Sequence, residues 1–250
     1  MSFPPQPQWQ AIVPGDARTL FRRVFGVWGL PRGVRVDNGH PWGLNFGLPP
    51  DLALWLIGLG VNLAWIAPGR PQHNGKVERC NGVAQQWAEP SRCASRTELQ
   101  EHLHRACLIQ REQYPSIAGR PRIEAFPELR RIERPYTSEA EETQWDLARV
   151  DGFLSDQVLY RRANARGAIW LYGWGRTLGR AHRGTEVCVR FDRPSRYWVV
   201  SNNQGEELKR LPAEELSRER ILALEVGRKR PRRQKSKVRG ETSRRVGGET

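Results

Sequence analysis

The sequence is poor in cysteine and has no long apolar run. Its 250 residues include four cysteines without a Cys-x-x-Cys pair or a regular spacing, so we expect reduced thiols rather than a disulfide framework or a zinc module. No apolar stretch approaches the ~18 residues that a membrane-spanning helix needs. The N-terminus also lacks a charged region followed by an apolar one, so we expect no signal peptide and no membrane partner. These absences favour a cytoplasmic protein.

Acidic residues are outnumbered by basic ones. Asp and Glu total 27 against 41 Lys and Arg, which gives a formal net charge of +14. This excess predicts a polyanionic partner, most plausibly nucleic acid, with a merely solubilising surface as the alternative. Residues 228–245 hold ten Lys or Arg and a single acid, Glu241. We therefore expect residues 217–250 to form a disordered basic tail that binds anions without sequence preference.

Residues 1–115 predict an α/β arrangement. Asp16 is placed to cap a first helix, in which Leu20, Val24 and Val27 recur at helical spacing. A short strand, GVRVD, then ends at Asp37 before an Asn-Gly turn. The further elements expected are a helix over residues 50–58, a strand over residues 61–66, a helix from about residue 75 to residue 87, and a helix that begins near Ser95 and ends before Pro115.

Two carboxylates stand at the ends of these elements. Asp37 leaves the GVRVD strand, and Glu78 lies close to the start of the helix that follows the loop at residues 67–74. Magnesium sites for phosphoryl chemistry are usually built from a few carboxylates together with substrate phosphates. The pair therefore predicts a site for Mg²⁺ (or Mn²⁺). The alternative for Glu78 is an ordinary first-turn glutamate favoured by the helix dipole.

Polar and cationic side chains surround Glu78. A loop that runs into a helix N-terminus is a suitable place for DNA phosphates. Lys76 and Arg79 are three residues apart and share a helix face. Solvated surface charges are the alternative. The residues that we expect to contact DNA are Asn38, Arg70, His73, Asn74, Lys76 and Arg79.

The rest of the chain differs in composition. Residues 116–143 are rich in Pro, Arg and Glu, which predicts a largely extended linker between domains. Residues 144–216 contain six candidate strands separated by turn signals, which predicts a small all-β barrel. We expect its aromatic residues, Trp170, Tyr172, Trp174 and Trp198, to lie in its core and rim, with base stacking as the alternative. Its expected cationic surface consists of Arg161, Arg162, Arg176, Arg180, Arg183, Arg190, Arg193 and Arg196.

Two segments carry a family resemblance. GLPRGVRVDNGHPW followed by WIAPGRPQHNGKVERCNG resembles the second half of the retroviral-integrase-type catalytic core of bacterial insertion-sequence transposases. The β-rich part is similar to the small barrel that follows this core in phage Mu-like and insertion-sequence transposases, so the resemblance covers about residues 17–216. It implies a ribonuclease-H-like sheet with an Asp–Asp–Glu triad, in which Asp37 is the second Asp and Glu78 is the Glu. Two metal ions held by such a triad activate a water or a DNA 3′ hydroxyl and stabilise the leaving oxygen.

The first Asp of this triad has no evident counterpart. In the family it lies on the first strand, and two more strands and a helix precede the second Asp. Here Asp16 is the sole acid before Asp37, and we interpret it as a helix cap. The resemblance therefore implies a partial catalytic core in residues 1–115, without its first strands, and an incomplete two-ion site.

Two functions remain open on these grounds. The chain is either a DNA transposition or integration protein that performs Mg²⁺-dependent strand cleavage and transfer once a first Asp is supplied, or a catalytically inactive DNA-binding or regulatory remnant of a transposase. The expected partners are DNA, as transposon ends and target, and a second copy of the chain or a full-length transposase. A bacterial, nucleoid-associated location follows from both.

Overall fold

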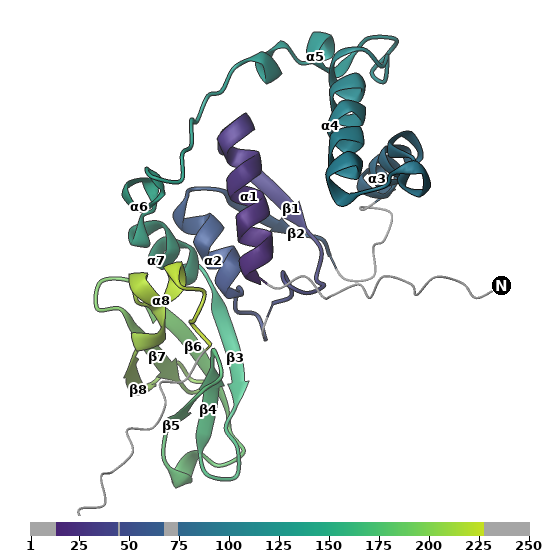
Figure 1. The fold of residues 1–250 in the computed structure, drawn as a ribbon. Coiled ribbons are helices and arrows are strands. Elements are labelled where there is room, and N and C mark those ends of the chain that lie inside the picture. Colours follow the sequence, from purple (N-terminus) through teal and green to yellow (C-terminus); the bar gives the residue numbers. More distant parts are fainter. Residues whose placement is uncertain (1–13, 45, 68–74, 228–250) are drawn as a thin grey trace, which may run out of the picture.

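The computed structural model describes residues 14–44, 46–67 and 75–227, and it is mixed α/β (Figure 1). Within these residues, no helix is both long enough and apolar enough to cross a membrane. The predicted DNA-contacting loop residues Arg70, His73 and Asn74 lie outside the described residues, as does the basic stretch from residue 228 onward.

The N-terminal part contains two helices and a parallel pair of strands. Strand β1 pairs in parallel with β2, with Gly33 opposite Asn62 and Val36 opposite Trp65. A helix joins the two strands, which is how parallel neighbours are usually connected. The strand that ends before Asp37, the helix after it and the second strand are therefore confirmed. The elements are α1 (Pro14–Trp28), β1 (Gly33–Val36), α2 (Asp51–Gly58) and β2 (Asn62–Trp65).

Helix α1 begins before its predicted cap. Pro14 is its first residue, where the fixed φ of proline suits a helix start. Asp16 therefore lies in the first turn, where a carboxylate complements the helix dipole, and its prediction as the N-cap is wrong. The buried face of α1 carries Ala17 and Phe25, whereas the apolar stripe seen in the sequence is about half exposed: Leu20, Val24 and Val27.

Helix α2 lies in the centre of the core. All its residues from Leu52 to Gly58 are buried, because α7 (Leu147–Ser155) and α8 (Arg218–Leu222) both pack against it. A helix that is apolar on all sides needs such cover. Its last residue, Gly58, faces Trp145 so closely that an added Cβ would lie 2.1 Å from the indole nitrogen.

Helices α3 (Gly75–Ala88) and α4 (Arg96–Glu112) pack against each other. Figure 1 shows them as a pair set to one side of α1 and the β1–β2 strands. The start of α4 confirms Ser95 as the N-cap, because Ser95 Oγ accepts from Glu98 N at 3.1 Å. The reciprocal bond of a capping box is shifted by one residue, since Glu98 Oε2 accepts from Ala94 N at 2.6 Å. A short 3₁₀ turn, η2 (Pro90–Arg92), lies between the two helices.

The segment predicted as a linker is only partly extended. It contains α5 (Arg122–Ala125), η3 (Pro127–Arg130) and α6 (Glu141–Gln144). Its second half is anchored by Arg134, whose guanidinium donates to the carbonyls of Pro31, Leu59 and Gly60 at 2.7 to 3.0 Å. The prediction of a largely extended linker is therefore wrong where these helical segments form, and the partly buried contacts of Arg134 fix the C-terminal half to the N-terminal part.

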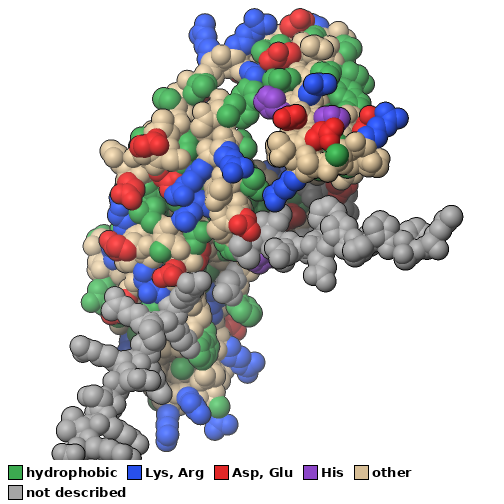
Figure 2. All heavy atoms as spheres, in the orientation of Figure 1, with side chains coloured by type: hydrophobic (Ala, Val, Ile, Leu, Met, Phe, Trp, Pro, Cys, Tyr) green, Lys and Arg blue, Asp and Glu red, His purple; other side chains and the backbone are tan. Residues whose placement is uncertain are grey.

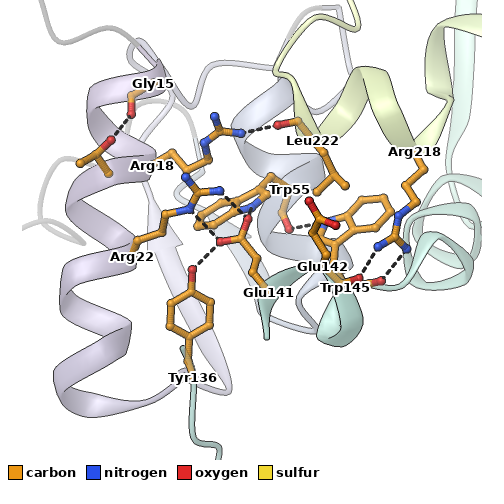
Figure 3. A network of polar contacts seen from close by, with 11 residues as sticks. Gly15, Arg18, Arg22, Trp55, Tyr136, Glu141, Glu142, Trp145, Arg218 and Leu222 are labelled. Carbon is orange, nitrogen blue, oxygen red and sulfur yellow. Dashed lines mark hydrogen bonds and ion pairs between the residues drawn. The ribbon is translucent and has the colours of Figure 1, made fainter. Parts of the chain in front are cut away.

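A network centred on Glu141 joins four helices (Figure 3). The carboxylate is 3% exposed and accepts from Arg22 at 2.7 and 2.8 Å, from Trp55 Nε1 at 3.1 Å and from the Tyr136 hydroxyl. Arg18, one turn before Arg22, donates to the carbonyl of Leu222 in α8. Both oxygens of the buried Glu141 carboxylate are hydrogen-bonded, and together with the Arg18 contact the network joins α1, α2, α6 and α8.

Six strands follow α7, but over the described residues they form no closed barrel. Four of them build an antiparallel sheet in the order β3-β6-β7-β8, and β4 pairs with β5 alone. The prediction of a barrel needs correction, because β4 and β5 pair with each other rather than with the four-stranded sheet, while α7 packs on β6 and the buried residues of the sheet share one cluster with the N-terminal core. The strands are β3 (Val158–Arg162), β4 (Ala168–Leu171), β5 (Trp174–Thr177), β6 (Glu186–Asp192), β7 (Tyr197–Ser201) and β8 (Glu207–Pro212), with η4 (Arg180–His182) and η5 (Glu214–Leu216) as 3₁₀ turns.

The hydrophobic core is shared between the two predicted domains. Buried residues such as Leu52 and Trp55 belong to the same cluster as Val187 and Val200 of the sheet. The predicted tail, residues 217–250, begins with ordered residues, because α8 and the turn after it bury side chains fully, including Ile221 and Val226. Residues 217–227 are therefore part of the fold.

Candidate metal site and nucleic-acid interface

The carboxyl ends of β1 and β2 meet at one edge of the parallel pair. Asp37 follows β1 directly and is exposed, and its Oδ1 accepts the Gly39 backbone N–H at 3.0 Å. Asn38 reaches across to β2, where its side-chain amide donates to the carbonyl of Ile66 at 2.7 Å. The backbone N–H of Ile66 in turn donates to the carbonyl of Val36 at 2.9 Å. These contacts fix Asp37 beside the point where the chain leaves β2.

This edge is where loop side chains gather in open parallel sheets. The loop that leaves it leads through residues 68–74 into α3, which carries Glu78 in its first turn. Glu78 and Arg79 are exposed. Lys76 belongs to α3, as the sequence predicts. The strand-end position of Asp37 and the helix-start position of Glu78 are therefore both observed.

The structure does not bring the two elements together. Helix α3 packs against α4, with Cys80 Sγ 3.7 Å from the side-chain oxygen of Gln110 in that helix. Figure 1 shows the α3–α4 pair apart from the end of β1. Among the described residues there is no group of three or more His, Cys, Asp or Glu side chains that could hold a metal ion.

The oxygen atoms at this edge are nevertheless suitable ligands for a hard cation. Asp37 Oδ2 receives no hydrogen bond from the described residues, and carboxylate oxygens are the ligands that magnesium prefers. Asn38 also positions this edge, because its side-chain amide donates to the carbonyl of Ile66 and holds the strand ends together. This positioning role could not be inferred from the sequence, since it depends on the register of β1 against β2.

Two of the arginines predicted to form a cationic surface on the β-rich part are engaged internally. Arg176 pairs with Glu215, which is fully buried and also accepts from Trp198 Nε1 at 2.8 Å. Arg196 Nε lies 3.0 Å from Asp151 Oδ2. Burial raises the pKa of the Asp151 carboxyl, and Arg196 opposes that shift. Neither arginine is available to DNA without breaking a buried pair.

Other charges of the β-rich part do face outward. Arg162, Arg183, Arg190 and Arg193 are exposed. Of the predicted core aromatics, Trp198 and Tyr172 are buried, whereas Trp170 is 51% exposed. Figure 2 shows Lys and Arg side chains spread along the whole face in view, with Asp and Glu among them. Charge on this face therefore does not single out one DNA-binding patch.

The chain was compared with models of known protein families. None of them matches it.

Proposed function

We propose that this chain acts on DNA in transposition or integration, as a ribonuclease-H-like protein of the insertion-sequence transposase type. The observation that carries the proposal is the edge where the parallel strands β1 and β2 end. Asp37 follows β1, and the loop toward Glu78 follows β2. The hydrogen bond from Asn38 to the Ile66 carbonyl links the two strand ends. The two sequence segments that resemble the family's catalytic core flank this edge. The net charge of +14 supports a polyanionic substrate.

In this proposal Asp37 and Glu78 hold Mg²⁺ (or Mn²⁺). Bound ions of this kind activate a water or a 3′ hydroxyl and stabilise the leaving oxygen of a phosphodiester. Asp37 supplies Oδ2 from a strand end whose backbone is fixed on both sides. Glu78 supplies its carboxylate from α3, so the α3–α4 pair has to approach the edge when metal and DNA bind. The residues proposed to contact DNA remain Asn38, Arg70, His73, Asn74, Lys76 and Arg79.

The test is cleavage of supercoiled plasmid DNA by the full chain with Mg²⁺, with Mn²⁺ or with a chelator. We expect weak metal-dependent nicking, because the first Asp of the triad has no evident counterpart. This nicking should be lost in Asp37→Asn and in Glu78→Gln, since each substitution removes one anionic metal ligand but keeps the side-chain size. Glu101→Gln is the matched control, because Glu101 is an exposed acid on the neighbouring α4. Equal nicking by all three variants would contradict the assignment of the site.

A second function is favoured by the position of α3 beside α4 (Figure 1). With the helix of Glu78 held there, the chain is a DNA-binding or regulatory protein that occupies transposon ends or forms mixed oligomers with an active transposase. The same experiment separates the two: DNA binding that is unchanged in Asp37→Asn and Glu78→Gln, without any metal-dependent nicking of plasmid by the unsubstituted chain, supports the second function.

A further inference from the structure

We propose that a groove between α1, α4 and the segment after α5 binds a single strand of nucleic acid. This "Trp28 groove" has a volume of about 720 Å³ and is lined by Trp28, Arg32, Arg111, Arg122 and Arg131, among others. Among the residues that the structure describes, neither Asp37, nor Glu78, nor any member of the predicted DNA-contacting set lines it. The inference rests on the proposed function, because it specifies a second contact of the chain with DNA.

The charge of the groove fits a phosphate backbone. Four arginines line it against two acids, Glu128 and Glu133. Arg32 pairs with Glu133 at 2.9 Å, but both side chains are more than half exposed, so this ion pair contributes little and a phosphate could replace its acid. Arg131 is exposed and makes no ion pair within the described part of the chain. Arginine forms paired hydrogen bonds to phosphate, which suits it to this contact.

The aromatic residue of the groove points to an unpaired strand. Trp28 ends α1 and is 44% exposed, although a buried position would be the ordinary one for a tryptophan. The guanidinium carbon of Arg111 lies 4.2 Å from its ring centre, and Arg111 also donates to the carbonyl of Leu129 at 2.6 Å. A base can stack on an aromatic ring or a guanidinium plane only when the face of the base is free, which is the case in single strands and not in duplexes.

The groove is also held in shape by the fold beneath it. Gly29, directly after Trp28, has a φ of +76°, and an added Cβ would lie 2.6 Å from the Arg134 carbonyl oxygen. The backbone N–H of Leu30 donates to that same carbonyl at 2.8 Å. The segment after η3 is thus docked closely on the end of α1, and Figure 2 shows an opening between this body and the α3–α4 pair. A strand can therefore enter from the solvent side without rearrangement of the core.

The experiment measures fluorescence anisotropy of a labelled oligo-dT of about 12 nucleotides, within the site size of single-strand binders, and of a duplex of equal length. The full chain is compared with Arg122→Ala/Arg131→Ala and with the control Arg96→Ala/Arg166→Ala, which removes two exposed arginines that belong neither to the groove nor to the predicted cationic surface of the β-rich part. We expect the groove variant to bind oligo-dT at least 10-fold more weakly and to lower the slope of log K against log salt by about 1.4, as two lost phosphate contacts do. The control variant is expected to keep the slope.

The stacking contact has its own pair of variants. Trp28→Ala should weaken oligo-dT binding on the order of 5- to 100-fold, and Trp28→Phe should retain most of the affinity, because an aromatic face remains. Arg122→Lys/Arg131→Lys should keep the salt slope and serves as the check that losses are not due to misfolding. Thermal melts followed by circular dichroism accompany every variant.

Three outcomes would overturn the inference: equal losses in the groove and control variants, unchanged binding in Trp28→Ala, or preference of the chain for duplex that the groove variants leave intact. If the chain binds neither oligo-dT nor the duplex, both the proposed function and the proposed groove site are contradicted. If metal-dependent nicking depends on Asp37 and Glu78 while the groove variants bind oligo-dT normally, only the groove fails.

Discussion

At the scale of single residues, Glu141 joins segments that lie far apart in the sequence. Its carboxylate is nearly fully buried, which alone would raise its pKa, but the hydrogen bonds from Arg22, Tyr136 and Trp55 outweigh this and lower the pKa. Because the pKa is lower in the folded state, the carboxylate stabilises the fold above its ordinary pKa and loses that contribution as the pH falls through the lowered value. Acid therefore weakens the network.

Ionisation of Tyr136 should weaken the same network at alkaline pH. Burial and the hydrogen bond to Glu141 raise the pKa of Tyr136 from 10.0 to about 12. Since the folded pKa is raised, the stabilisation is complete below pH 10 and is lost as the pH rises toward 12. We expect the free energy of unfolding in urea to fall by about 2 kcal/mol from this residue between pH 9 and pH 11.5.

The control for this prediction compares two tyrosines. Tyr136→Phe should lower stability at pH 9 but remove most of that fall at high pH. Tyr160→Phe, at a position that is 64% exposed, should leave the fall in place. Equal pH dependence of all three proteins would show that Tyr136 does not titrate abnormally.

At the scale of elements, replacing two helical glycines by alanine should change the stability of the protein in opposite directions. Gly26 lies in α1 with open space where a Cβ would lie, whereas a Cβ on Gly58 would meet the Trp145 ring at 2.1 Å. Gly26→Ala should therefore stabilise the protein by about 0.5–1 kcal/mol, since alanine is the better helix former. Gly58→Ala should destabilise it by about 1–3 kcal/mol through overpacking. Thermal melts of both variants check the sign, and a stabilised Gly58→Ala would contradict the packing of α2 against Trp145.

The elements that could be predicted are those with local signals. The GVRVD strand, the apolar run of α2 and the Ser95–Glu98 cap were all readable from periodicity and capping chemistry. Helix α6 was not, because a segment rich in Pro, Arg and Glu gives no apolar pattern, and Glu141 acquires its role only through partners such as Arg22, 119 residues away. Local sequence cannot encode such a contact.

For the candidate site, too, only the local features could be predicted from the sequence. The placement of Asp37 after a strand and of Glu78 at a helix start follows from local pattern and is observed. Their mutual position depends on the packing of α3, and the partner that it takes here is α4. The residues of the Trp28 groove come from separate elements, so no motif in the sequence could have assembled them.

At the scale of the whole molecule, the single core predicts how the chain responds to truncation. Among the described residues, the hydrophobic cluster extends to Val226. A chain that ends at Gly227 should therefore melt at the same temperature as the full chain. A chain that ends at Ser217 loses Ile221 and Val226, both fully buried, and should be destabilised by at least about 2 kcal/mol.

The measurement is a thermal melt of the three chain lengths at equal concentration. It also tests the sharing of the core, because one cooperative transition is expected for the full chain. Two separate transitions, or an unchanged melt for the chain that ends at Ser217, would show that residues 14–115 and the β-rich part are stabilised independently.

The contact between Arg18 and the carbonyl of Leu222 spans 204 positions of sequence. During translation, at roughly 5–20 residues per second, α1 therefore emerges on the order of 10–40 seconds before the segment that closes over it is made. Throughout that interval the nascent chain exposes apolar side chains of α1 and α2 that are covered later. Assistance from a chaperone at the ribosome would thus matter most for the earliest part of this polypeptide.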